Sequence, residues 1–301
     1  MGMSAEVEMA SLGECVAWGH AALAAPGAGR LAVFAIEGNG DVVLGRFGAG
    51  DGALMTRASG GPVLCLSGKV LYVGLALDRA RPLIPDVTIV NFLNRYVRPL
   101  RHALSGAGRP VAYFGRDWLS VEKRPVAQVG FAYDDRHALF EAWVSIEGSL
   151  WEDASRSSFR GRLPTSLAVR DWRVVVEDVA GAYRKTLGLE RARKPLAIGV
   201  VPTAERLGRP TKFDAEASCA IGSMGICMHG GRVSLGGDWM ANGDEVARIE
   251  SSIEEGIKRG DVLDHGSVLT ALSSETLGLF GVETLASYAT LIVMKVDSQR
   301  N

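Results

Sequence analysis

Short apolar runs separated by glycine-containing turns fill the first part of the chain, and this pattern restricts its fold more than any other feature. Residues 31–36 and 41–44 flank Gly38-Asn39-Gly40, where glycine and asparagine tolerate the positive φ of a tight hairpin. The apolar runs 62–66 and 70–77 are separated by another glycine-containing turn. The sequence therefore predicts two hairpins at the start of a β-rich domain.

Helical patterns alternate with further strands up to residue 190. Apolar side chains recur at helical spacing in three segments, 9–25, 87–104 and 172–187. Apolar runs typical of strands cover 111–114, 119–122, 126–133 and 138–146. This mixture predicts an α+β fold in which helices pack on a mixed β-sheet.

A segment rich in proline and basic residues, 191–210, interrupts this pattern. We expect it to be a connector that holds one short strand over 196–201. After it, the sequence predicts a hairpin and then helices, over 217–228, 233–239, 244–258, 267–272 and 282–293. The predicted organisation is a larger domain at 1–190, a connector at 191–210 and a small C-terminal α+β accessory domain at 211–301.

Charge and composition limit the partners and the compartment. Hydrophobic residues make up 47% of the 301 residues, so the chain can bury a sizeable core. The formal net charge is -1, so we expect neither nucleic acid nor a membrane as a partner. No apolar run reaches the roughly 18 residues of a membrane span, and the N-terminus lacks the layout of a signal peptide. With four scattered cysteines, the chain is expected in the cytoplasm with reduced thiols.

The segment Thr56-Arg57-Ala58-Ser59-Gly60-Gly61-Pro62 has the composition of an anion-binding turn. Gly60 and Gly61 let the backbone approach a ligand closely and present N–H donors. Ser59 adds a hydroxyl donor, and Arg57 can neutralise a phosphate or a carboxylate. The alternative is an ordinary Gly-Gly turn beside a solvated arginine, because short motifs often match by chance.

Two more segments place charged side chains near strand ends. Arg46 follows the run 41–44, and Asp117 precedes the next predicted strand. Lys123 and Arg124 lie just before the strand that begins at about 126. A cation held over a site can stabilise charge on a transferring phosphoryl or acyl-phosphate group. Taken singly, each residue equally fits a solvated position in a loop or turn.

In their order along the chain, these segments resemble the lipoate–protein ligase branch of the biotin/lipoate ligase family. That branch has, approximately, Pro-x-Val-x-Ile-Gly-Arg, Arg-Arg-x-Ser-Gly-Gly-Gly-x-Val, Gly-Arg-Asn-Asp and Gly-Arg-Lys-Val-Ser-Gly. The counterparts here are Val42–Arg46, Thr56–Val63, Gly115–Trp118 and, more faintly, Lys123–Gln128. Gly236-Gly237-Asp238-Trp239 is similar to the Gly-Asp-Phe that ends a hairpin in the family's small domain. The resemblance spans roughly residues 10–290.

The resemblance implies a cleft for a medium-chain carboxylic acid such as lipoate and for its acyl-adenylate. It implies ATP and Mg²⁺ as cofactors and a lysine of a lipoyl-carrier domain as the acyl acceptor. It assigns ligand-binding roles to Arg46, Arg57, Ser59, Gly60, Gly61 and Asp117, and catalytic roles to Lys123 and Arg124.

Several positions depart from the family's motifs. The lysine that precedes Val-Ser-Gly falls on Pro125, which has neither a charge nor an N–H donor, in the alignment that matches 126–130 best. A shifted alignment places Arg124 there, and Lys123 could reach in from a neighbouring position. Asp117 replaces an asparagine, which adds a carboxylate near the expected phosphates.

The function therefore stays open at the level of the sequence. If active, the chain is an ATP-dependent lipoate–protein ligase or an acyltransferase. The alternatives are a non-catalytic binding or accessory protein with this fold, and a family member that uses another small acid. Related octanoyltransferases use a cysteine as acyl acceptor, but Cys65 between two leucines favours buried packing. Cys219, Cys227 and His229 lack the spacing of a zinc site, so no metal site is expected.

Overall fold

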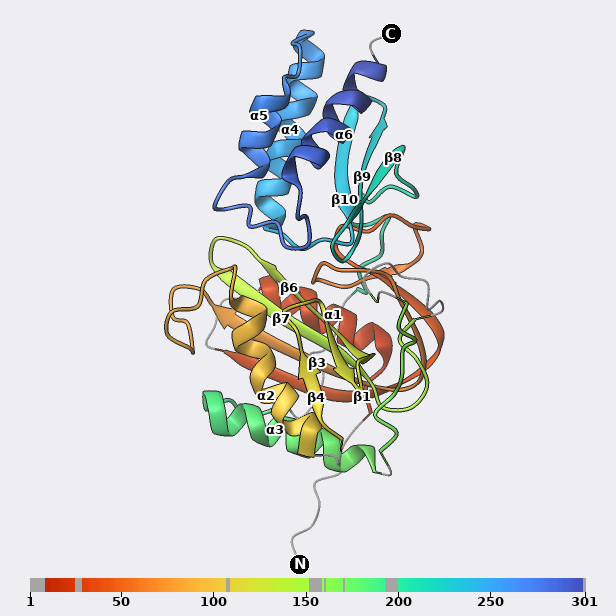
Figure 1. The fold of residues 1–301 in the computed structure, drawn as a ribbon, viewed down its shortest axis with the longest axis vertical. Coiled ribbons are helices and arrows are strands. Elements are labelled where there is room, and N and C mark those ends of the chain that lie inside the picture. The colour runs from red at the N-terminus through yellow and green to blue at the C-terminus, as the bar shows by residue number, and fades with distance from the viewer. Residues whose placement is uncertain are drawn as a thin grey trace, which may run out of the picture.

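A seven-stranded mixed β-sheet forms the centre of the larger part of the molecule (Figure 1). The computed structural model describes residues 9–24, 29–106, 109–151, 159, 161–169, 171–192 and 200–299. In spatial order the strands are β2 (Met55–Thr56), β1 (Arg30–Leu44), β3 (Leu64–Asp78), β7 (His137–Ser145), β6 (Arg124–Tyr133), β5 (Trp118–Val121) and β4 (Val111–Tyr113). Neighbouring strands are antiparallel, except that β1 and β2 are parallel. The predicted α+β class is confirmed.

The two hairpins predicted at the start of the chain are wrong. β1 and β3 are continuous strands of 15 residues each, and they pair with each other from Arg30–Ala76 to Val43–Leu64. Gly40, with a φ of +84°, lies where the pairing register shifts, so it forms a bulge and not a turn. Gly68, with a φ of +68°, continues β3, and a Cβ there would lie 2.6 Å from the carbonyl oxygen of Glu147. Both glycines therefore bend a long strand without reversing it.

Helices cover both faces of this sheet. α1 (Leu12–Ala24) packs on one face, while α2 (Phe92–Gly106) and α3 (Trp172–Leu187) pack on the other. The alternation of side chains along β1 produces the two cores, because 31, 33 and 35 face α2 and α3 whereas 32, 34 and 36 face α1. α3 has the predicted bounds, since the carboxylate of Asp171 caps its N-terminus and Gly188 ends it in a left-handed conformation.

A second sheet of three antiparallel strands lies above the first in Figure 1. Its elements are β8 (Ala215–Cys219), β9 (Gly222–His229), β10 (Arg232–Gly237), α4 (Gly243–Arg259), α5 (His265–Leu272) and α6 (Leu285–Ser298). The run 217–228, predicted as one strand, is divided between β8 and β9. The chain reverses just before Ser223, whose backbone N–H donates to the Asp238 carboxylate over 2.9 Å.

The second sheet and its three helices have a hydrophobic core of their own, to which Phe47 from the larger part also contributes. The predicted boundaries at 190 and 211 stay a prediction. Most of the strand expected at 196–201 lies outside the described residues. Among the described helices, none has both the length and the apolar character that a bilayer crossing requires.

Candidate functional site

The glycine turn, which we define as residues 56–62, connects β2 to β3 and is buried throughout. Its backbone donors are used inside the protein. The N–H of Ser59 donates to Oε2 of Glu141 over 2.9 Å, and the N–H of Gly60 donates to the carbonyl oxygen of Phe131 over 3.2 Å. The first two donors of the predicted anion cradle therefore already have acceptors.

The third donor contacts the C-terminal part of the chain. The N–H of Gly61 donates to the carbonyl oxygen of Trp239 over 3.2 Å. A Cβ added to Gly60 would collide with the same carbonyl and lie 2.8 Å from Cα of Met240. Backbone therefore lies against backbone here, and glycine is required because a side chain would separate the two segments.

Arg57 is fully buried and does not point away from the turn. One guanidinium nitrogen donates to the carbonyl oxygens of Pro62, over 2.7 Å, and Gly60, over 3.2 Å. Its backbone N–H donates to the carbonyl of Leu44 over 3.0 Å. The predicted ligand contact of Arg57 stays a prediction, and the structure shows the side chain stabilising its own turn.

Asp117 lies beside a residue that the motif comparison missed, Gln128 of β6. The amide Nε2 of Gln128 donates to Oδ2 of Asp117 over 3.0 Å, and both side chains are buried. The same nitrogen is 3.4 Å from the position that a Cβ on Gly61 would take. Gln128 is the polar residue inside the apolar run 126–133, which is the signal that could have identified it.

Lys123 and Arg124 lie far from the glycine turn. Both are exposed at the turn between β5 and β6, and the guanidinium of Arg124 donates to the carbonyls of Leu163 and Pro164 over 3.2 and 2.9 Å. Gln128, the residue of β6 nearest to them that contacts the glycine turn, is four residues beyond Arg124, or about 13 Å at the usual rise of a strand. The structure therefore does not bring the two predicted catalytic residues to the predicted ligand-binding residues.

Arg46 follows β1 and lies against the N-terminus of α4, where its guanidinium contacts Gly243. Its backbone N–H donates to the carbonyl oxygen of Ser59 over 2.9 Å. Burial lowers the pKa of its side chain, while the carboxylates of Asp244 and Asp134 act in the opposite direction. Arg46 thus connects the glycine turn to the acidic surroundings of α4.

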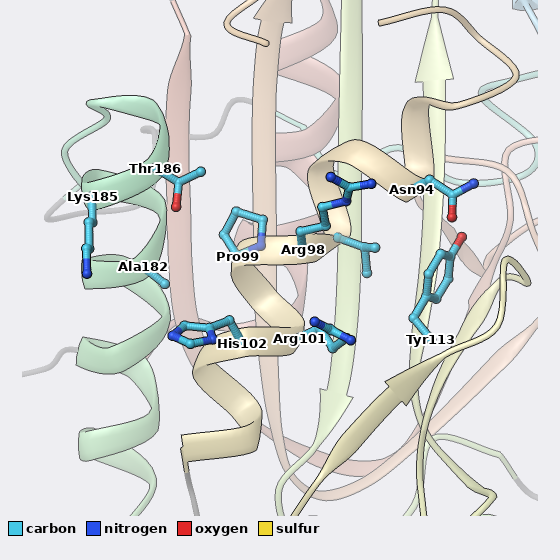
Figure 2. A pocket seen from close by; sticks show the side chains of 10 residues that line it. Asn94, Arg98, Pro99, Arg101, His102, Tyr113, Ala182, Lys185 and Thr186 are labelled. Carbon is cyan, nitrogen blue, oxygen red and sulfur yellow. The ribbon is translucent and has the colours of Figure 1, made fainter.

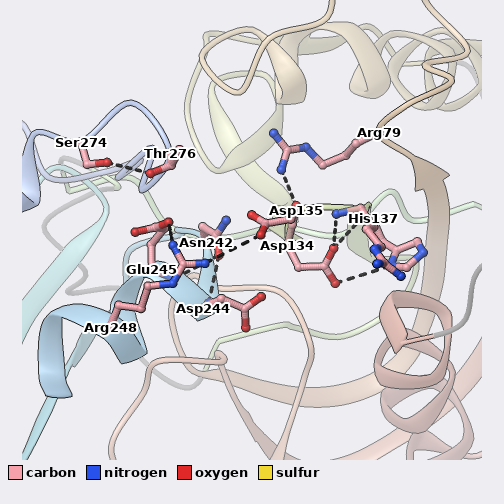
Figure 3. A network of polar contacts seen from close by, with 11 residues as sticks. Arg79, Asp134, Asp135, His137, Asn242, Asp244, Glu245, Arg248, Ser274 and Thr276 are labelled. Carbon is pink, nitrogen blue, oxygen red and sulfur yellow. Dashed lines mark hydrogen bonds and ion pairs between the residues drawn. The ribbon is translucent and has the colours of Figure 1, made fainter.

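Those surroundings form a polar network between the β6–β7 turn and α4 (Figure 3). The carboxylate of Asp134 accepts the backbone N–H of His137 over 2.6 Å, and Asp135 lies 3.7 Å from the guanidinium of Arg248 on α4. Oδ1 of Asn242 caps α4 by accepting the N–H of Asp244 over 2.9 Å. The ion pair of Asp135 with Arg248 thus connects the β6–β7 turn to α4.

A buried carboxylate behind the glycine turn was also missed. Glu141 of β7 accepts the hydroxyl of Tyr72 over 2.8 Å as well as the N–H of Ser59. Burial, reinforced by this carboxylate, raises the pKa of Tyr72 well above its usual value. Nε2 of His20 lies 2.8 Å from the carbonyl oxygen of Thr56, so Nε2 carries the proton, and burial lowers the pKa of this histidine.

The four cysteines are present as thiols, and burial raises the pKa of Cys15 and Cys219. Cys65 is half-buried on β3, with its sulfur 3.8 Å from the carbonyl oxygen of Gly40. Within the described part of the chain, no three His, Cys, Asp or Glu side chains are grouped in a way that could hold a metal ion.

Comparison with known proteins relates this fold to others. Neither the protein-family models nor the curated proteins contain a match to the chain. Plasmodium falciparum LipL1 in complex with lipoate is 12% identical, with a TM-score of 0.51 over 88% of this chain and 87% of that one.

Two further structures are similar over less of the chain. A bi-partite lipoate protein ligase from Thermoplasma acidophilum is 12% identical over 63% of this chain and 86% of that one, with a TM-score of 0.49. The biotin acetyl coenzyme A carboxylase synthetase of Helicobacter pylori is 11% identical over 52% and 61%, with a TM-score of 0.33. The fold of this chain is that of the lipoate–protein ligases, the branch of the biotin/lipoate ligase family that its motifs resemble.

Proposed function

We propose that this chain is a binding or accessory protein that has the ligase fold but does not transfer acyl groups. The observation that carries the proposal is the buried pair of Gln128 and Asp117 beside Gly61. A neutral amide cannot stabilise developing negative charge as a lysine or arginine does, and an adjacent carboxylate repels a phosphate. The cations predicted to act here, Lys123 and Arg124, lie at the exposed start of β6, four and five residues before Gln128.

The glycine turn, as folded, does not fit ATP with its Mg²⁺. Each of the three backbone N–H groups could donate to a ligand only if it broke its hydrogen bond to Glu141, Phe131 or Trp239. An anion that displaced these acceptors would leave the Glu141 carboxylate in the same buried place. We therefore derive no step through ATP at this turn.

The fold supports the choice of ligand and partner classes to test. LipL1 is described with lipoate and the T. acidophilum ligase with an E2 lipoyl domain. For this chain we propose a small carboxylic acid of the lipoate type as ligand and a lipoyl-carrier domain as partner. Its thiols fit the reducing conditions of the cytoplasm, where we propose that it acts.

ATP–pyrophosphate exchange with lipoate, octanoate and biotin tests the proposal. We expect no exchange with any acid, in protein whose circular dichroism and cooperative unfolding show that it is folded. A lipoate–protein ligase assayed in parallel serves as the positive control. Exchange with one of the acids would overturn the proposal and establish the ligase activity.

Binding is measured separately, by calorimetry with lipoate, octanoate and an isolated lipoyl domain. Saturable binding of an acid or of the domain, without exchange, supports the binding role. Absence of binding to all three, in folded protein, would contradict the ligand and partner classes proposed.

A further inference from the structure

The cavity between α2, α3 and β4 has a volume of about 780 Å³ (Figure 2). It lies on the face of the sheet that α2 and α3 cover, whereas Ala58 of the glycine turn packs in the core on the α1 face. Its volume falls within the range typical of small-molecule sites, roughly 300–1,000 Å³. Its polar lining includes Asn94, Arg98, Arg101, His102, Tyr113 and Lys185.

The lining is basic. Arg98, Arg101 and His102 lie three and four positions apart on α2, so they occupy neighbouring turns of the helix, and Lys185 lies on α3 (Figure 2). None of the described residues that line the cavity carries a carboxylate. Since the whole chain has a formal net charge of -1, the cavity is a local exception to its charge balance.

These cations are exposed and have no counter-ion in the described part of the chain, which they share with Arg79 and Arg173 but not with three other arginines of the larger part. Arg109, Arg116 and Arg191 lie 3.0, 3.5 and 3.1 Å from glutamate carboxylates. In the described part of the chain, the guanidinium groups of Arg98 and Arg101 and the ammonium group of Lys185 have neither an ion-pair partner nor a hydrogen-bond acceptor. The structure thus holds several unneutralised cations around one cavity.

Neutral polar groups lie at one end of the cavity. The Asn94 amide and the Tyr113 hydroxyl lie near each other there (Figure 2). The hydroxyl is buried and has no hydrogen-bond partner in the described part of the chain. Burial raises the pKa of Tyr113, so the hydroxyl keeps its proton and remains a donor. A buried donor without an acceptor is unfavourable, and a ligand atom that accepts from it would remove that cost.

We infer that this cavity binds a nucleoside polyphosphate, with its phosphate groups on the cations of α2 and α3 and its nucleoside against Asn94 and Tyr113. Arginine favours phosphate because its planar guanidinium donates two parallel hydrogen bonds to phosphate oxygens. Arg98 and Arg101, one turn apart, can contact successive phosphates of one chain. The concave shape and limited volume fit a small molecule, whereas a nucleic acid needs an extended basic stripe.

Calorimetric titration of the full chain with ATP and with inorganic tripolyphosphate tests the site. We expect both to bind, ATP more tightly, and the double variant Arg98→Ala/Arg101→Ala to weaken both at least about tenfold. Arg232→Ala, an exposed arginine of the small sheet, is the matched control and should bind as the unmodified chain does. No binding of either anion, or unchanged affinity in the double variant, would overturn the inference.

The nucleoside contact has a separate test. Tyr113→Phe should weaken the binding of ATP several-fold and leave the binding of tripolyphosphate unchanged. Equal effects on the two affinities would contradict the role given to Tyr113. Hydrogen exchange with saturating ATP should protect 94–106 and 182–187, and protection confined to the glycine turn would place the ligand elsewhere. Binding of poly-glutamate without binding of tripolyphosphate would assign the cavity to an acidic protein. These results do not depend on whether the protein binds lipoate or another acid at the glycine turn.

Discussion

The side-chain amide of Gln128 donates a hydrogen bond to the carboxylate of Asp117 over 3.0 Å, and both groups are buried beside the glycine turn. Asp117 directly precedes β5, whose first residue, Trp118, pairs with Gln128 of β6. A buried carboxylate has to keep its donors, because water cannot replace them. Substitution of Gln128 therefore tests how much this hydrogen bond contributes to the stability of the protein.

Gln128→Leu should destabilise the protein by about 1–3 kcal/mol, because the Asp117 carboxylate loses a buried donor. The measurement is urea unfolding followed by circular dichroism. Gln299→Leu, at an exposed position after α6, is the matched control and should change the free energy of unfolding by less than about 0.5 kcal/mol. Equal effects at the two positions would show that the Asp117 contact contributes nothing.

Gly60→Ala should destabilise the contact between the glycine turn and the C-terminal part. The new Cβ would lie 2.8 Å from Cα of Met240, where only backbone can move, so we expect a loss of about 1–3 kcal/mol. Gly181→Ala in α3, with open space around its Cβ, should instead stabilise by about 0.5–1 kcal/mol. Thermal unfolding of both variants measures the difference, and a stable Gly60→Ala variant would contradict the packing described.

Stability should depend on the protonation of Glu250, whose carboxylate accepts the backbone N–H of Leu235. Burial raises its pKa from 4.5 to about 7. Between these pH values the folded state binds more protons than the unfolded state, so this contribution is complete below about pH 4.5 and is lost as the pH rises through 7. The loss amounts to up to about 3 kcal/mol.

Unfolding free energies measured from pH 4.5 to 8 test this dependence. Glu250→Gln, which is neutral throughout, should remove that part of the pH dependence. Glu255→Gln, at an exposed position of the same helix, should retain it. An unchanged pH profile in Glu250→Gln would mean that the carboxylate titrates normally in the folded protein.

Replacing a residue of the turn between β5 and β6 by glycine should stabilise the folded protein. Glu122 and Lys123 have φ values of 51° and 64°, a conformation that favours glycine and asparagine. Lys123→Gly should therefore stabilise by roughly 0.5 kcal/mol in chemical unfolding. Lys123→Ala removes the same charge without easing the backbone, and a gain equal to that of Lys123→Gly would point to charge as the cause.

Local signals predicted the helices and most of the short strands well. α3 has the predicted bounds because its N-cap Asp171 and its terminal Gly188 are encoded next to the helix itself. The β1 and β3 strands were divided wrongly because a glycine that bends a strand and a glycine that reverses it look alike in sequence. Only the pairing of Gly38 with Gly68, 30 residues apart, distinguishes the two cases.

The site was predicted in part. The segment 56–62 does form one compact turn, but the acceptors of its donors, Glu141 and Trp239, come from segments about 80 and 180 residues away in the chain. Such long-range partners decide whether a glycine turn is open to a ligand. Motif spacing also misplaced the residue of β6 that faces the turn, since Pro125 and Gln128 differ by three positions on one strand.

The two outermost strands of the large sheet, β2 and β4, are short, and their length bears on whether two chains can pair at high concentration. β4 has three residues and β2 has two, and β2 pairs with only Val43 and Leu44 of the 15 residues of β1. Among the described residues, no strand lies along the rest of the outer edge of β1. A neighbouring chain can add to a sheet only where it finds a long row of unpaired N–H and C=O groups. The outer edge of β1 is thus the place where such growth could begin, and the isolated bridges of Met9 with Ala35 and of Arg191 with Leu31 occupy part of it.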